Sequence, residues 1–115
     1  MGLDLPRLAE ERSLALHRLV VERARTDPQV LRKARQRVSE WLVTGAVART
    51  RAESWARLLA LPNDEIFARI DVSSEAARAL RKSTPFAGVI DPRTRWRVWR
   101  EVRARIEQEH DEEFG

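Results

Sequence analysis

The sequence has no cysteine and no tyrosine, and its 115 residues include only four glycines, five prolines and two lysines. Without cysteine the chain can form no disulfide and offers no thiolate for catalysis or for binding zinc. No apolar run approaches the ~18–20 residues of a membrane-spanning helix, and the first residues lack the basic and then apolar layout of a signal peptide. We therefore expect a cytoplasmic protein.

The residue patterns of common catalytic and metal sites are also missing. His17 and His110 lie far apart in the sequence without neighbouring ligands, and we expect both imidazoles to be solvated. Ser13, Ser39 and Ser54 fall within predicted helices and lack the sharp turn that exposes a nucleophilic serine. There is no glycine-rich phosphate loop. We therefore expect no catalytic, cofactor-binding or metal-binding residue and no enzymatic activity.

Helical signals, in contrast, recur along the whole chain. Asp4, Asp27 and Asp91 each precede a proline by one or two residues, and this combination is typical of the start of a helix. Thr50 and Glu53 match a capping box, and Gly45 is placed to end the helix before it. The spacing of apolar residues predicts helices at residues 6–25, 28–43, 51–60, 63–70, 75–82 and 92–109.

No segment shows the period-two alternation of a strand, and no hairpin turn is evident. The sequence therefore predicts an all-α fold, a single compact domain of five or six helices with a Pro/Gly loop before the last long helix. We expect this domain to span residues 1–109. Residues 110–115 are predicted to form an acidic, frayed tail.

Charge is distributed unevenly along the chain. Residues 26–60 carry seven positive and three negative side chains, whereas the C-terminal end is acidic. The polar face of the second predicted helix is the most basic, and its candidate contacts to nucleic-acid phosphates are Arg32, Lys33, Arg35 and Arg37. The alternative is an ordinary solvated helix face.

A standard helix-turn-helix does not fit this region. With Gly45 placed at the turn, Trp41 falls where the first helix needs a small residue, and Arg51 falls where a buried apolar residue is required. Two steric requirements of the motif thus fail together.

The segment from Ser83 to Arg105 combines an apolar loop with an arginine-rich helix. Phe86, Val89 and Ile90 are too apolar to remain in water, so the loop either folds back over the core, which we favour, or forms a partner-binding patch. In the helix, Trp96 and Trp99 continue a stripe with Val102 and Ile106, which predicts that both tryptophans pack in the core. The arginines around them would stack on their rings or contact an acidic partner.

Two parts of the sequence resemble small all-helical antitoxin-like proteins of bacterial two-gene toxin–antitoxin modules. These parts are ERSLALHRLVVERARTDPQVLRKARQRVSEW, residues 11–41, and ARALRKSTPFAGVIDPRTRWRVWREVR, residues 77–103, about half of the chain. The resemblance implies a stoichiometric inhibitor of a co-expressed toxin, which could be a nucleotidyltransferase, a nucleotide-dependent kinase or a nuclease. The chain has neither the ribbon-helix-helix strand nor the helix-turn-helix with which better-known antitoxins bind DNA.

These observations lead to a functional hypothesis of direct binding to a protein partner, the cognate toxin. The candidate partner-binding residues are Phe86, Val89, Ile90, Arg97, Trp99 and Arg100. A basic nucleic-acid-binding accessory protein and a helical dimerisation module, with a homo-oligomer as its product, are the alternatives.

Overall fold

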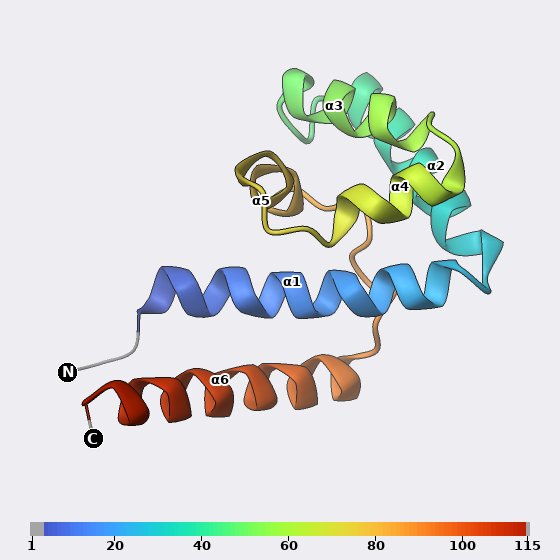
Figure 1. Ribbon diagram of the computed structural model, residues 1–115. Coiled ribbons are helices and arrows are strands. Elements are labelled where there is room, and N and C mark those ends of the chain that lie inside the picture. Colours follow the sequence, from blue (N-terminus) through green and yellow to red (C-terminus); the bar gives the residue numbers. More distant parts are fainter. Residues whose placement is uncertain (1–3, 115) are drawn as a thin grey trace.

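The computed structural model describes residues 4–114, and this part of the chain contains six α-helices and no strand. The helices are α1 (Leu5–Ala24), α2 (Pro28–Thr44), α3 (Arg49–Leu59), α4 (Asn63–Ile70), α5 (Glu75–Arg81) and α6 (Pro92–Phe114), as Figure 1 shows. The all-α prediction is confirmed, and the last long helix begins at Pro92 as expected.

The aspartates before prolines act as helix caps. The Asp27 carboxylate accepts a hydrogen bond of 2.9 Å from the backbone N–H of Gln29 at the start of α2. Asp91 accepts from both the backbone N–H and the hydroxyl of Thr94, and these two bonds lower the pKa of the Asp91 carboxyl. At the other end of α2, Gly45 has φ of 73°, the left-handed conformation that glycine adopts without steric cost.

The start of α3 differs from the prediction. The helix begins at Arg49, and its N-cap residue Ala48 makes no side-chain capping bond. The predicted capping box is therefore wrong, because Glu53 pairs with Arg49 at 2.8 Å and does not reach back to Thr50. An ion pair four residues apart on the helix surface has replaced the cap.

The end of α6 also differs, since the helix continues to Phe114 rather than ending near residue 109. Two pairs spaced four residues apart support its last turns, Arg103 with Glu107 at 2.9 Å and Gln108 with Glu112 at 3.3 Å. Residues 110–114 of the predicted acidic tail thus belong to α6, and Gly115 lies outside the described residues.

α1 lies between two groups of apolar side chains. In Figure 1, α6 runs along one side of α1, and α2 to α5 lie on the other side. The larger buried cluster comprises Val20, Val21, Ala24, Val30, Leu31, Ala34, Val38, Trp55, Leu58, Leu59, Ile66, Phe67, Ile70, Phe86 and Ile90. The smaller one comprises Leu8, Val98, Val102 and Ile106. Leu16 and Leu19 of α1 pack against both clusters and join them.

α6 is attached to the rest of the molecule through α1 alone, among the helices of residues 4–114. Arg105 of α6 donates to Glu11 of α1 at 2.9 Å, and Arg7 of α1 pairs with Glu109 of α6. This arrangement makes the molecule elongated, with dimensions of 50 × 29 × 24 Å. The side of α6 that faces away from α1 is therefore not covered by another helix.

The loop between α5 and α6 folds back over the core, as favoured from the sequence. Phe86 is 4% exposed and Ile90 is 8% exposed. The Phe86 ring packs edge to face against the Trp55 indole, with ring centroids 5.6 Å apart. Gly88, with φ of 87°, allows the chain to turn after Phe86.

His17 is buried, so the prediction of a solvated imidazole is wrong for this residue. Its Nδ1 lies 2.7 Å from the Ser13 carbonyl oxygen and its Nε2 lies 2.9 Å from the Thr84 hydroxyl. A neutral ring satisfies both contacts, with Nδ1–H donating to Ser13 and Nε2 accepting from Thr84. Burial lowers the pKa of His17 below its usual value of 6.5, and the nearby Arg81 lowers it further.

We expect stability to fall as the pH is lowered below 6.5, the usual pKa of the histidine side chain. In this range the unfolded chain binds a proton that the folded chain resists, so the free energy of unfolding decreases with a limiting slope of about 1.4 kcal/mol per pH unit. Above that pH this contribution is constant. Urea denaturation between pH 5 and 8 measures the effect.

The His17→Gln variant is the control, since it still contains His110. Its stability should change much less between pH 7 and pH 5 than that of the native sequence. An equal pH dependence in both proteins would contradict the assignment.

Candidate functional site

The most unusual exposed surface is on α6, on the side opposite its buried residues. Arg93, Trp96, Arg97 and Arg100 occupy positions i, i+3, i+4 and i+7, so their side chains leave the helix on one side. We call these four residues the outer face of α6. The residues that pack toward α1 are Val98, Val102 and Ile106. The two sets divide the first part of the helix into a buried and a free side.

Trp96 is the centre of this face. Its side chain is 59% exposed, and it is the only aromatic residue among the large exposed hydrophobic side chains of residues 4–112, for which the structure describes side-chain exposure. The others are Leu5, Leu42, Val43 and Val72. Leaving an indole in water forgoes the free energy that its burial in a partner would supply. The prediction that Trp96 packs in the core is wrong.

The arginines around Trp96 are largely unused within the molecule. Arg93 and Arg100 make no hydrogen bond or ion pair with any described residue, and both are exposed. Arg97 lies 3.8 Å from the Glu101 carboxylate, and both side chains are more than 60% exposed. Such exposed pairs contribute little to stability, because water screens them.

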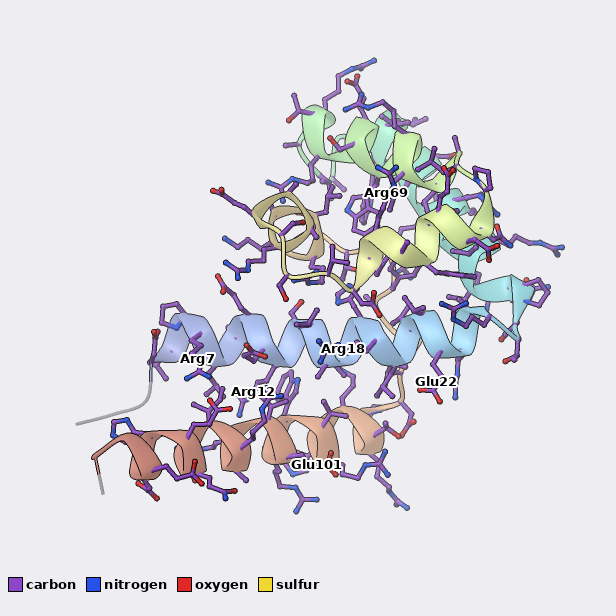
Figure 2. The ribbon with its side chains drawn as sticks, viewed as in Figure 1. Arg7, Arg12, Arg18, Glu22, Arg69 and Glu101 are labelled. Carbon is purple, nitrogen blue, oxygen red and sulfur yellow. The ribbon has the colours of Figure 1, made fainter. Side chains whose placement is uncertain are left out.

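Trp99 has a different environment from Trp96, although their ring centroids are only 6.2 Å apart. Trp99 is half-buried, and the guanidinium carbons of Arg12 and Arg95 lie 5.2 and 5.6 Å from its ring centroid. Arg12 belongs to α1 and lies between the two helices (Figure 2). The ring of Trp99 is therefore engaged by cations of its own chain, as the sequence suggested for the tryptophans of this helix. Trp96 is the more accessible of the two.

The apolar loop residues are not part of an exposed patch. Phe86 and Ile90 are buried and Val89 is half-buried. Their side chains pack against the larger core cluster. The structure thus separates the candidates chosen from the sequence, leaving Arg97 and Arg100 exposed while the three loop side chains contribute to the core.

The basic residues of α2 do not form one surface either. Arg35 donates from Nε to the Leu59 carbonyl oxygen at 3.1 Å, on the side of α3. Arg37 donates to the carbonyl oxygens of Pro85 and Ala87, on the side of the loop. Arg32 and Lys33 are exposed, and their side chains make no hydrogen bond or ion pair with the described part of the chain. Arg35 and Arg37, two of the four predicted nucleic-acid contacts, thus lie on opposite flanks of the helix.

Other kinds of site find no support in the part of the chain that the structure describes. It contains no group of three or more histidine and acidic side chains that could hold a metal ion. None of its helices is long and apolar enough to cross a membrane. Comparison of the chain with protein-family models, with curated proteins and with solved structures finds no match.

The signal for this face was present in the sequence, in the spacing of Arg93, Trp96, Arg97 and Arg100. The sequence-based prediction placed Trp96 in the buried stripe and therefore did not include this face. Residues 96 and 98 are both apolar, but they lie on opposite sides of the helix, so only one of them can face α1.

Proposed function

We propose that the protein acts by binding an acidic protein partner through the outer face of α6. In the form that the resemblance implies, this partner is the toxin of the same two-gene module, and stoichiometric binding neutralises it. The observation that carries the proposal is the exposed Trp96 among arginines that have no strong partner of their own.

Residue types and exposure both support a protein partner. Tryptophan and arginine dominate the energetics of protein–protein interfaces, and they do so where the aromatic side chain enters a pocket and cations meet carboxylates. Trp96 has more than half of its surface available for such burial. Arg93 and Arg100 would gain ion pairs without losing any that they now make.

The geometry of α6 also supports a partner laid along the helix. α6 spans 23 residues and, among the described helices, contacts α1 alone, so the side that faces away from α1 is open to a partner along the helix. The basic half from Arg93 to Arg100 is followed by an acidic half, from Glu101 to Glu112, that includes ion pairs within the chain. An acidic partner is thus directed to the first half of the helix.

A second copy of this chain is the alternative occupant. An antiparallel pair of α6 helices would match basic halves with acidic halves, as a two-fold symmetric interface requires. Such a pair would bury few apolar side chains besides Trp96, so a heterologous partner with a pocket for the indole fits this face better.

The nucleic-acid alternative stays a prediction. It gains no specific support, because Arg35 and Arg37 point to opposite flanks of α2 and each donates to backbone carbonyl groups.

The experiment is co-expression with the product of the neighbouring gene. We expect that product to arrest growth when expressed alone, and we expect co-expression of this protein to restore growth. Purification of the pair should give a one-to-one complex by light scattering. A growth arrest that persists, together with two proteins that elute separately, would contradict the proposal.

A further inference from the structure

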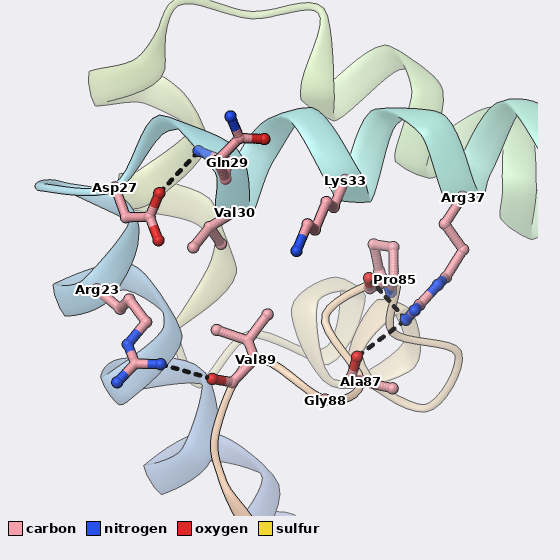
Figure 3. Close-up of a pocket in the computed structure, with 10 residues that line it drawn as sticks. All are labelled: Arg23, Asp27, Gln29, Val30, Lys33, Arg37, Pro85, Ala87, Gly88 and Val89. Atoms are coloured by element: carbon pink, nitrogen blue, oxygen red, sulfur yellow. Dashed lines mark hydrogen bonds between the residues drawn. The ribbon is translucent and has the colours of Figure 1, made fainter.

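A basic pocket lies on a different part of the molecule, between α2 and the loop that precedes α6. It has a volume of about 380 Å³. Figure 3 shows its lining, with α2 on one side, the residues from Pro85 to Val89 on the other and the end of α1 at one edge. Its charged side chains are Arg23, Asp27, Lys33 and Arg37.

Two of these cations are fixed in place by the loop backbone. Arg23 donates through Nη1 to the Val89 carbonyl oxygen at 3.0 Å. Arg37 donates through Nη1 to the carbonyl oxygens of Pro85 and Ala87, at 3.2 and 3.1 Å. Each guanidinium therefore retains N–H groups at Nη2 and Nε that make no bond within residues 4–114. These N–H groups lie at the pocket and can still donate hydrogen bonds to a ligand.

Lys33 is the third cation and the least engaged. Its side chain extends from α2 toward the loop, between Arg23 and Arg37 (Figure 3). Its ammonium group makes no hydrogen bond or ion pair with the described part of the chain. Three cations that line one pocket raise its positive potential, and this potential favours the binding of an anion.

The only carboxylate of the pocket does not neutralise these cations. The Asp27 carboxylate caps α2 by accepting a hydrogen bond from the Gln29 N–H. It forms no ion pair with Arg23 or Lys33. Three cations and one carboxylate leave a surplus of two positive charges, which matches a phosphate monoester in its dianionic form.

We propose that this pocket binds the phosphate monoester group of a small organic molecule. The volume lies at the low end for ligand sites, which suits a phosphate with a small organic body. Val30 and Val89 supply apolar contact for that body. Arg32 and Arg35, which a nucleic-acid backbone would need, do not line the pocket.

The test is titration of the isotope-labelled protein by NMR at pH 7.5 and constant ionic strength. The probes are sodium phosphate, phenyl phosphate and an oligothymidylate without terminal phosphates, with sodium chloride as the reference. We expect saturable shifts for the amides of Gln29, Val30, Gly88 and Val89 with both phosphates. Phenyl phosphate should bind more tightly than inorganic phosphate, and chloride should give no saturable shift.

Two charge-matched variants decide whether the pocket is the cause. Lys33→Gln should weaken phenyl phosphate binding roughly tenfold, the loss typical of one charge-assisted bond. Arg32→Gln removes the same charge one residue away, outside the pocket, and should leave binding within about twofold. Equal losses in both variants, no saturation with either phosphate, or tighter binding of the oligothymidylate would each overturn the proposal.

Discussion

Replacing Phe86 with alanine is expected to lower the free energy of unfolding by about 3–5 kcal/mol. The ring is 4% exposed and contacts Trp55 and His17 edge to face, with centroid distances of 5.6 and 6.2 Å. Its removal leaves a cavity in the larger core cluster and detaches the loop that precedes α6. A loss of this size is a large part of the stability of a domain of 115 residues.

Urea denaturation followed by tryptophan fluorescence measures this effect. The matched control is Val43→Ala, because Val43 is 87% exposed, and its effect should stay within about 0.5 kcal/mol. If Phe86→Ala cost less than 1 kcal/mol, the loop would not be held on the core in solution. Phe86 would then return as a candidate for contact with a partner.

Replacing Trp96 with alanine is expected to weaken binding of the partner while leaving the stability of the fold nearly unchanged. It should change the free energy of unfolding by no more than about 0.5 kcal/mol, because its side chain is mostly in water. It should weaken binding of the partner by about 2 kcal/mol or more, which corresponds to roughly thirtyfold in Kd, as for a central aromatic residue of an interface.

Isothermal titration with the purified partner measures this loss, with Val43→Ala again as the control for an exposed apolar side chain. Arg100→Glu should also weaken binding, and the loss should diminish as salt is added, since it removes an exposed charge contact. Native affinity in Trp96→Ala would exclude the outer face of α6 as the anchor.

The helices were predictable because their signals are local. Asp27 and Asp91 cap the N–H groups beside them, and Gly45 adopts the one backbone conformation that ends α2 there. Such contacts join residues two to four positions apart, so short sequence patterns are enough to predict them. The end of α6 was missed because pairs such as Arg103–Glu107 extend a helix without any capping residue to mark it.

The environment of side chains was less predictable because it depends on packing between distant segments. His17 lies on the polar side of a simple helical stripe, but α1 is covered on two sides, and Thr84 approaches the imidazole from the loop before α6. The periodicity of one helix reports how apolar each side is, and it does not report how many neighbours the helix has.

The candidate site was partly predictable for the same reason. The sequence made Arg97 and Arg100 candidate partner contacts, and both side chains are exposed. The sequence-based prediction chose Trp99 as a partner contact, whereas the structure exposes Trp96. Residue type could not distinguish the two tryptophans, because the packing of Val98 against α1 decides which indole turns outward. The pocket between α2 and the loop was also out of reach, because Arg37 and Pro85 are 48 residues apart in the chain.

Site-specific photocrosslinking tests the central claim most directly. A benzophenone amino acid is placed at Arg100 on α6 or, as the control, at Arg32 on α2, and each variant is co-expressed with the product of the neighbouring gene. Irradiation at position 100 is expected to give a covalent adduct whose second component is that product, whereas position 32 should give none. An adduct at position 32 alone, or an adduct at position 100 that contains two copies of this chain, would contradict the assignment of α6 as the face that binds the partner.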